Sequence, residues 1–398
     1  MGKKLIIGLI LSTLLTLTSS FPAAAFTINA RAAVLMDPAS GQVLYAQDGS
    51  RRLAPASVTK VMTMLLIMEA VEEGRIKWDD PITTSATAAG MGGSQVYLKE
   101  GEVMTLHDMF KAVAVVSAND ASTAIAEHLY GSVTDFIDAM NRKAKALGLK
   151  NTHFANETGL PDSGHYSSAY DLAVISRELL KYPKVLEYTS IWLDSLRGGA
   201  FILKNTNDLI KAYPGTDGLK TGHTEEAKFC LAATHHRGNF RLLSVVMGAA
   251  SNSSRVAESK RLLEYGYRTY ERRIIKKAGS KAGEIYLKEG SPQTFPVKVK
   301  TDFAIVVLRG GKQQLISTRV VPLKNLKFPI NAGQRVGEVQ AVTGGKIVGR
   351  TSVYSMVKVK RANFLVRWWR GFRDFLSGIF GRRRHSQGGL TEKTPIFL

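Results

Sequence analysis

The sequence predicts an α/β protein in which one antiparallel sheet forms from both ends of a first domain, with helices covering it. Residues 29–47 alternate as two strands around turn residues at 37–41. The range 228–249 repeats this pattern around a turn at 236–239. Helical periodicity fills the sequence between the two hairpins. Strands from distant parts of the chain are therefore expected to meet in one sheet.

Apolar residues recur at helical spacing in the ranges 57–74, 105–130, 133–147 and 168–181, and a last helix is expected over 253–271. Strands thus open the domain, helices fill its middle, and strands with one helix close it. This order assigns residues 26–272 to a single domain.

The composition changes near residue 272. Residues 273–359 are rich in Val, Ile, Lys and Gly, and glycine pairs at 310–311 and 344–345 mark turns. We expect a small all-β, sandwich-like domain here. It contains no cluster of residues suited to catalysis, so it is interpreted as a spacer or an interaction module.

Residues 1–25 are typical of a secretory signal. Lys3 and Lys4 precede a mostly apolar run over 5–17, and Ala23-Ala24-Ala25 provides small residues for cleavage. The alternative, an uncleaved anchor, is disfavoured because the run is shorter than the roughly 20 residues that span a bilayer. We expect export to the outer face of the cytoplasmic membrane.

Residues 360–398 form a separate tail. Residues 363–380 divide on a helical wheel into a wide aromatic and apolar face and an arginine-rich face, and Arg382-Arg383-Arg384 follow. Such a segment predicts an amphipathic helix that lies on a membrane surface through residues 363–384. Docking of the helix on the protein itself is the alternative. Three arginines within the segment argue against a membrane-spanning helix.

The chain has 54 Lys and Arg residues against 33 Asp and Glu residues, a formal net charge of +21. Anionic lipids and cell-wall polymers are the expected partners of such a charge on an exported protein. Nucleic acid is not expected, because the basic residues are spread along the chain and no recognition motif is present. Cys230 is the only cysteine, so no intramolecular disulfide forms, and we expect it to be buried and unreactive.

Three short motifs occur in chain order: S-x-x-K at Ser57-Val58-Thr59-Lys60, S-x-N at Ser117-Ala118-Asn119, and K-T-G at Lys220-Thr221-Gly222. The first begins a helix, the second follows an apolar stretch, and the third precedes the strand expected from residue 228. Each motif alone is weak. Their joint occurrence in this order is a strong signal of one site.

The pairing of Ser57 with Lys60 has a chemical rationale. A serine hydroxyl needs a nearby base to become a nucleophile, and positions three apart share one side of a helix. Lys60 precedes a long apolar run, whose burial lowers a lysine pKa, and Lys220 supplies a second positive charge. Taken singly, Ser57 could be an N-cap, Lys60 could extend to solvent, and Asn119 could be a turn residue.

The motifs, with the phrases LAPASVTKVMT, VSANDAS, NETGLPDSGHYSSAYDLA, TDGLKTGHT and RVAESKRLL, resemble the serine D-alanyl-D-alanine carboxypeptidases, which are low-molecular-weight penicillin-binding proteins. The likeness spans about residues 27–360 and the tail. It implies the penicillin-binding, β-lactamase-like transpeptidase fold, an α/β sandwich beside a helical cluster. The middle motif here is S-A-N, where S-G-N is common in relatives.

The resemblance implies a role for each motif residue. Ser57 is the acylated nucleophile, Lys60 the general base, and Ser117 a relay that passes a proton to the leaving group. Asn119 holds both Lys60 and the peptide carbonyl of the substrate. The backbone N–H of Ser57, at a helix start, supplies one donor of an oxyanion hole.

Substrate binding is assigned to five residues on the same basis: Lys220, Thr221, Gly222, His223 and Arg255. The K-T-G residues and Arg255 would face the free carboxylate at the end of the substrate. The backbone N–H of His223 would complete the oxyanion hole, while its side chain could equally be structural.

The expected function is removal of the terminal D-alanine from peptidoglycan stem peptides ending in D-Ala-D-Ala, with β-lactams as covalent inhibitors. Nothing in the sequence requires a metal or an organic cofactor. A β-lactamase is the nearest alternative, but its water-activating glutamate is matched only by residue type, at Glu157. Transpeptidase or endopeptidase action, which would share the acyl-enzyme, and a catalytically silent binding protein also remain open.

Overall fold

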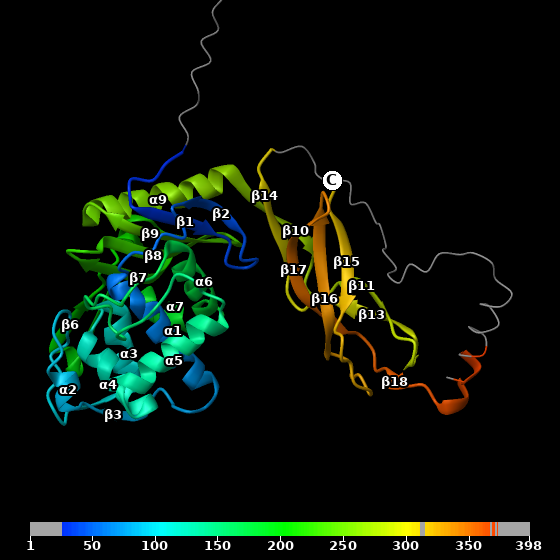
Figure 1. Cartoon of the computed structure of the whole chain (residues 1–398), viewed down its shortest axis with the longest axis horizontal. Coiled ribbons are helices and arrows are strands. Elements are labelled where there is room, and N and C mark those ends of the chain that lie inside the picture. The colour runs from blue at the N-terminus through cyan, green and yellow to red at the C-terminus, as the bar shows by residue number, and fades with distance from the viewer. Residues whose placement is uncertain (1–25, 311–314, 367, 371, 373–398) are drawn as a thin grey trace, which may run out of the picture.

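The computed structural model describes residues 26–310, 315–366, 368–370 and 372. The predicted signal at 1–25 and most of the predicted tail helix lie outside the described residues. Within the described residues, a region of helices packed on a sheet comes first. A β domain follows it, and its first strand begins directly after α9 (Figure 1). The predicted α/β class with a C-terminal β domain is confirmed.

The central sheet joins the two ends of the first region. Its strands run in the order β2-β1-β9-β8-β7 and pair antiparallel throughout. Their bounds are Ala32–Met36 for β1, Val43–Gln47 for β2, Thr216–Thr224 for β7, Lys228–Arg237 for β8 and Phe240–Ala249 for β9. The pairing of β1 with β9 is the predicted meeting of both hairpins. The strand β7, which contains the K-T-G motif, was not predicted as a strand.

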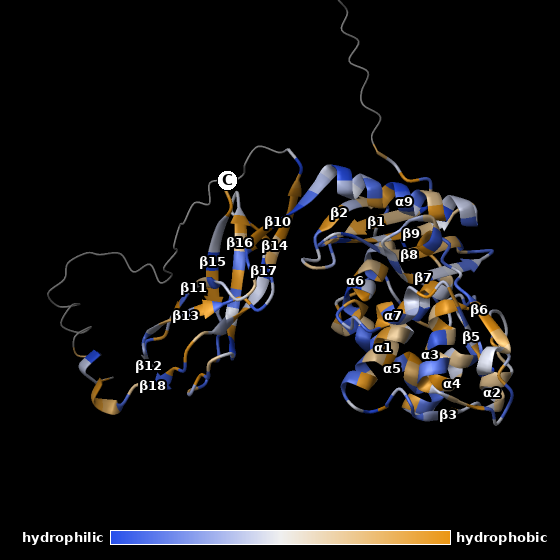
Figure 2. Cartoon of the chain, turned by 180° about the vertical axis from the view of Figure 1, so that it is seen from behind, coloured by the Kyte–Doolittle hydropathy of each residue, from blue (hydrophilic) through white to orange (hydrophobic). Residues whose placement is uncertain are grey.

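Helices cover both faces of this sheet (Figure 1). The longer ones are α1 (Lys60–Glu72), α3 (Leu106–Val115), α4 (Asn119–Tyr130), α5 (Val133–Ala146), α6 (Ala169–Leu179) and α9 (Asn252–Thr269). The shorter ones are η1 (Ala56–Thr59), α2 (Ala86–Ala89), α7 (Val185–Thr189), η2 (Arg197–Gly199) and α8 (Leu209–Ala212). Hydrophilic and hydrophobic residues alternate along α9 (Figure 2), which packs its buried residues against β8 and β9. In contrast, α1 is buried on nearly all sides, as expected for a helix that is apolar all round.

The range 105–130, which has continuous helical periodicity, forms two helices, because the helical backbone is interrupted between Val115 and Asn119. Ser117 has a φ of +65°, in the left-handed region that residues other than glycine seldom adopt. The break therefore presents the S-A-N motif at the start of α4. Four short strands accompany the helices: β3 (Pro81–Thr83), β4 (Val103–Thr105), β5 (Leu193–Leu196) and β6 (Phe201–Lys204).

The β domain has its own core. A five-stranded antiparallel sheet runs β11-β13-β17-β16-β15, accompanied by the pairs β10-β14 and β12-β18. The strands are β10 (Tyr270–Lys276), β11 (Lys281–Tyr286), β12 (Gly290–Ser291), β13 (Thr294–Lys298), β14 (Phe303–Leu308), β15 (Ser317–Pro322), β16 (Arg335–Thr343), β17 (Lys346–Ser355) and β18 (Lys360–Arg361). Phe295, Val297 and Val339 are fully buried at its centre.

The described part of the tail follows β18. Its helical residues expose large apolar side chains, with Phe364 at 70%, Trp368 at 58% and Trp369 at 59% of full exposure. Among the residues that the structure describes, no helix is long and apolar enough to cross a membrane.

Candidate active site

Ser57 and Lys60 lie at the junction of η1 and α1, below the edge strand β7. The Nζ atom of Lys60 lies 3.2 Å from the Oγ atom of Ser57 and donates to it. Ser57 is half-buried, whereas Lys60 has no solvent exposure. The serine can therefore reach a substrate while its partner is shielded from water.

Two further acceptors fix the lysine amine. Lys60 Nζ donates to Asn119 Oδ1 at 2.6 Å and to the backbone oxygen of Thr158 at 2.7 Å. Burial lowers the pKa of Lys60 to about 7, although the carboxylates of Glu157 and Asp120 act in the opposite direction. A charged amine donates to all three oxygens, whereas a neutral amine can donate to Asn119 and Thr158 and accept from the Ser57 hydroxyl, so the same geometry accommodates both protonation states.

The S-A-N motif faces this amine from α4. Asn119 divides its amide between Lys60 and the backbone oxygen of Gly92, to which Nδ2 donates at 2.7 Å. Ser117 is 4% exposed, and its Oγ atom has no hydrogen-bond partner among the described residues. A buried hydroxyl without a partner is free to bond a substrate or leaving-group atom.

The loop before this motif is held by α4. Asn119 N–H donates to the oxygen of Ser94, and the buried carboxylate of Asp120 accepts from the N–H groups of Val96 and Leu98. Sequence reasoning missed Asp120. A carboxylate next to a catalytic motif gives no sequence signal that it binds a loop backbone.

The K-T-G motif lies within β7 and passes close to η1. A Cβ atom at Gly222 would lie 2.8 Å from the oxygen of Pro55 and 3.0 Å from the nitrogen of Ser57. Only glycine allows this approach, which brings the strand backbone against the Ser57 amide. Lys220 is 1% exposed, and burial lowers its pKa, with the nearby cations Lys60 and Arg255 acting in the same direction.

A second contact extends the site beyond the motifs. The hydroxyls of Thr221 and Thr206 lie 2.6 Å apart. Arg255, on α9, donates to the backbone oxygens of Gly222 at 3.1 Å and Thr206 at 3.3 Å. Its Nε atom has no partner among the described residues. Arg255 therefore holds the backbone of Gly222, which follows Thr221, and of Thr206, whose hydroxyl contacts Thr221. Thr206 was not predicted from the sequence, because an isolated threonine in KNTND belongs to no motif.

His223 and Cys230 are neighbours of the site on β7 and β8. The exposed ring of His223 packs against Phe229 in a tilted arrangement, at a centroid distance of 4.1 Å. Cys230 is fully buried opposite Gly222, and burial raises the pKa of its thiol to about 11. This thiol is thus not activated, in agreement with its sequence interpretation.

The segment that follows α5 supplies backbone rather than side chains. Thr158 contributes its oxygen to Lys60, and a Cβ atom at Gly159 (φ +86°) would lie 1.9 Å from the oxygen of Ala56. The carboxylate of Glu157 accepts from Thr123 Oγ1 at 2.5 Å. The Glu157 side chain is thereby hydrogen-bonded to α4. The phrase NETGLPD was recognised in the sequence, but its backbone contact with Lys60 was not foreseeable.

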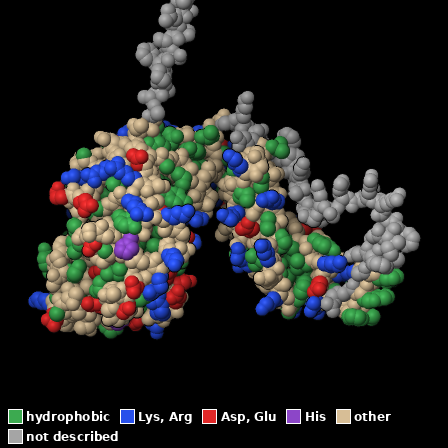
Figure 3. Space-filling view, viewed as in Figure 1, with side chains coloured by type: hydrophobic (Ala, Val, Ile, Leu, Met, Phe, Trp, Pro, Cys, Tyr) green, Lys and Arg blue, Asp and Glu red, His purple; other side chains and the backbone are tan. Residues whose placement is uncertain are grey.

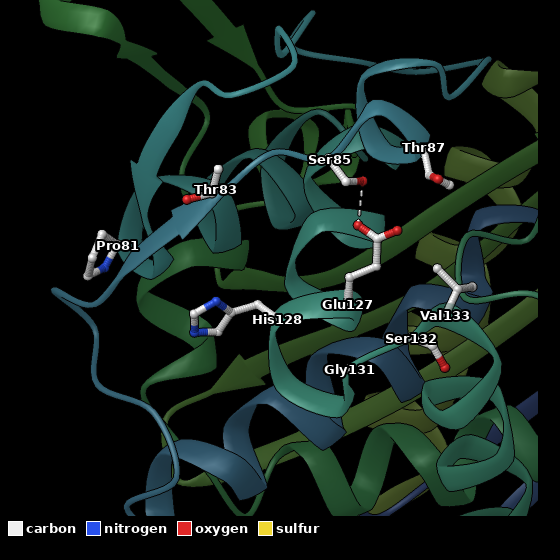
Figure 4. Close-up of a pocket in the computed structure, with 9 residues that line it drawn as sticks. All are labelled: Pro81, Thr83, Ser85, Thr87, Glu127, His128, Gly131, Ser132 and Val133. Carbon is white, nitrogen blue, oxygen red and sulfur yellow. Dashed lines mark hydrogen bonds between the residues drawn. The ribbon is translucent and has the colours of Figure 1, made fainter.

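A separate hollow lies at the other end of α4, lined in part by Ser85, Glu127 and His128 (Figure 4). Ser85 donates to Glu127 at 2.6 Å. Asn119 begins α4 and His128 lies in its last turn. At about 1.5 Å per residue, His128 lies roughly 13 Å along the helix axis from Asn119, so the hollow is not part of this site.

Comparisons with known proteins agree with this geometry. Residues 18–251 match the family described as D-alanyl-D-alanine carboxypeptidase, and residues 270–361 match the C-terminal domain of penicillin-binding protein 5. The chain is 42% identical over 340 residues to D-alanyl-D-alanine carboxypeptidase DacF of Bacillus subtilis (strain 168), covering 85% of this chain and 87% of that protein.

Solved structures give the same result. Penicillin-binding protein 5 from Haemophilus influenzae is 33% identical with a TM-score of 0.71, covering 84% of this chain and 99% of that chain. Penicillin-binding protein D2 from Listeria monocytogenes, in an ampicillin-bound form, is 33% identical with a TM-score of 0.56, covering 61% and 98%.

The fold, the three motifs and these matches define a serine-dependent enzyme of the penicillin-binding class. The chain belongs to the D-alanyl-D-alanine carboxypeptidase family. The predicted family and enzyme class, a serine-type D-alanyl-D-alanine carboxypeptidase that processes cell-wall peptidoglycan, are confirmed.

Proposed function

We propose that Ser57 of this carboxypeptidase attacks the terminal D-Ala-D-Ala bond of a peptidoglycan stem peptide, with Lys60 as the base. The contact between Lys60 Nζ and Ser57 Oγ, at 3.2 Å and with the amine fully buried, carries the proposal. A lysine with a pKa of about 7 is substantially neutral near neutral pH and can accept the serine proton.

The reaction then proceeds in balanced steps. Ser57 Oγ bonds to the peptide carbonyl carbon as its proton passes to Lys60, and the N–H groups of Ser57 and His223 receive the oxyanion. The C–N bond breaks when the leaving nitrogen takes a proton through the unpartnered hydroxyl of Ser117. D-Alanine leaves, and water then hydrolyses the ester, releasing the shortened peptide and restoring Ser57.

The terminal carboxylate of the substrate is assigned to the cationic side of the site. Lys220 and the Thr221 hydroxyl lie on β7, and Arg255 lies behind the same strand. Arg255 bonds backbone oxygens here, so its effect on the substrate is exerted through the position of β7 and through its charge. This makes Arg255 a positioning residue.

Penicillin is proposed to acylate the same serine and to leave slowly. The ampicillin-bound relative supports the acylation. Slow release is supported by Glu157, because Thr123 bonds its carboxylate and no described contact joins it to Ser57. Rapid turnover of penicillin with only transient labelling of the protein would favour a β-lactamase instead.

Mass spectrometry of a pentapeptide-ending muropeptide tests the mechanism. The wild type and the control Ser253→Ala, at an exposed serine of α9, are expected to remove one alanine, whereas folded Ser57→Ala is expected to remove none. If Ser57→Ala works as fast as the wild type, the nucleophile is wrong. Addition of an amine acceptor separates hydrolysis from transpeptidation, because a transpeptidase would form the aminolysis product.

We further propose that the protein is exported and lies on the outer face of the cytoplasmic membrane through residues 363–384. The exposed side chains of Phe364, Trp368 and Trp369 support this location, since aromatic residues favour the membrane interface. Deletion of 363–398 is expected to abolish binding to anionic vesicles. Trp368→Ser/Trp369→Ser, which keeps every arginine, is expected to weaken it. Unchanged binding of the deletion variant would contradict the anchor.

A further inference from the structure

The positive charge of the protein is concentrated in its C-terminal part. Residues 26–272 contain 27 Lys and Arg residues and 27 Asp and Glu residues, so this part is formally neutral. Residues 273–359 contain 16 and 4 respectively, a formal charge of +12. Figure 3 shows the resulting predominance of blue over red side chains on the β domain. Basic residues are thus spread along the chain, as the sequence indicated, but their excess over acidic residues lies in its C-terminal part.

Strand register brings several of these cations together. Arg335 on β16 lies opposite Tyr354 on β17, and Tyr354 lies opposite Lys298 on β13. Lys298 in turn lies opposite Lys281 on β11. The Nζ atom of Lys300 lies 4.1 Å from the centroid of the Tyr354 ring. We refer to Lys281, Lys298, Lys300 and Arg335 as the cationic row.

The cationic row lies on the outer surface of the sheet. The strand neighbours Val297, Val336 and Val353 are fully buried in the core, and side chains alternate between the two surfaces of a strand. Lys300 and Arg335 are exposed and Lys298 is half-buried. Neighbouring strands are about 4.8 Å apart, so the row crosses four strands over roughly 15 Å.

Acidic side chains neutralise little of this surface. Lys281 pairs with Glu284, but in the described part of the domain no acidic side chain pairs with Lys298, Lys300 or Arg335. Glu338, on the same surface, accepts a hydrogen bond from Gln340. Lys281 and Lys298 stand opposite each other, and the carboxylate of Glu284 pairs with only the first of them.

The charge continues along the same surface. Gln340 on β16 lies opposite Arg350 on β17 and opposite Arg319 on β15. Arg319 donates to Gln340 at 2.8 Å, which holds its guanidinium against the sheet. Two arginines thus extend the basic surface along the strands, with Arg350 four residues from Tyr354 on β17. Guanidinium groups suit the forked oxygens of phosphate.

We propose that the cationic row binds a soluble linear polyanion with a phosphate-containing backbone, and so holds the enzyme beside anionic polymer in its surroundings. A polymer is favoured over a membrane because no exposed large apolar side chain belongs to the row, whereas Phe364, Trp368 and Trp369 are exposed in the tail after β18. The row places cations on three of four neighbouring strands, β11, β13 and β16, with Tyr354 of β17 between the last two. Such an array matches a linear chain of negative charges. This surface is distinct from the catalytic site and independent of it.

The experiment measures binding of the full chain to fluorescently labelled long-chain polyphosphate across a range of salt concentrations. The row variant is Lys298→Gln/Lys300→Gln/Arg335→Gln. The matched control, Lys324→Gln/Lys327→Gln/Lys346→Gln, removes the same charge from exposed positions of the same domain, two in the segment after β15 and one at the start of β17. Single variants at Lys300 and Arg335 keep the test valid if the triple variant does not fold.

The row variant is expected to bind about tenfold or more weakly, with the slope of log affinity against log salt reduced by about one for each cation removed. The control is expected to lose less than about threefold. Equal losses in both variants would show a nonspecific charge effect and overturn the proposal. It is also overturned if the row variant loses binding to anionic phospholipid vesicles but not to polyphosphate, or if only single-stranded DNA is bound.

Discussion

The catalytic region and the β domain use the same type of residue in opposite environments. In the catalytic region, the side chains of Lys60 and Lys220 are at most 1% exposed. In the second, Lys300 and Arg335 extend into solvent from the surface of a sheet. Burial lowers the pKa of Lys60 to about 7. A buried lysine can therefore exchange a proton near neutral pH, whereas an exposed one remains a permanent charge.

Net charge alone does not predict the chemistry of either region, because it does not show which charged side chains are buried. The catalytic region is formally neutral in sequence, with 27 basic and 27 acidic residues over 26–272. Its reactivity nevertheless depends on lysines that the fold removes from water. The β domain has no comparable buried lysine among its described residues, and its excess charge faces outward.

Loss of the buried amine is expected to have the largest effect. Lys60→Met should lower the rate of acylation by penicillin about 10³-fold, since a positioned base contributes about 10²- to 10⁴-fold. Lys298→Met should leave that rate within about twofold of the wild type. Stopped-flow measurement of acyl-enzyme formation compares them. A loss below tenfold for Lys60→Met would remove Lys60 as the base.

The ionisation of Lys60 should also couple the stability of the folded protein to pH. The folded-state pKa of Lys60, about 7, lies below that of an unfolded lysine, about 10.4. Between these values the unfolded chain binds more protons, so the contribution of Lys60 to stability rises with pH, by up to about 1.4 kcal/mol per unit.

Chemical denaturation at pH 7 and pH 9 measures this coupling. The free energy of unfolding of the wild type, relative to Lys60→Met, is expected to increase between these two pH values. A pH-independent difference for Lys60→Met would mean that the buried amine keeps its ordinary pKa.

The sequence was sufficient for the parts of the fold that local patterns encode. The two hairpins, the helix that begins at Ser57-Lys60 and the β domain follow from alternation, periodicity and glycine turns. The three motifs identified residues that the structure brings together, with Lys60 contacting both Ser57 and Asn119. The roles of these residues in catalysis stay predictions until they are tested.

Other features depend on contacts between distant segments and leave no local pattern. The break at Ser117 interrupts a stretch whose helical periodicity is continuous. Thr158 contacts Lys60 through its backbone oxygen, and Thr206 acts through one hydroxyl on Thr221. The cationic row was not predicted because it exists only in the register of four strands.

The pH dependence of acylation tests the central claim most directly. If Lys60 must be neutral to accept the Ser57 proton, the second-order rate of penicillin acylation should fall about tenfold for each pH unit below a midpoint near 7 and level off above it. Lys298→Gln should give the same profile. A wild-type rate that does not change between pH 5 and 8, or a midpoint above 9, would contradict the account.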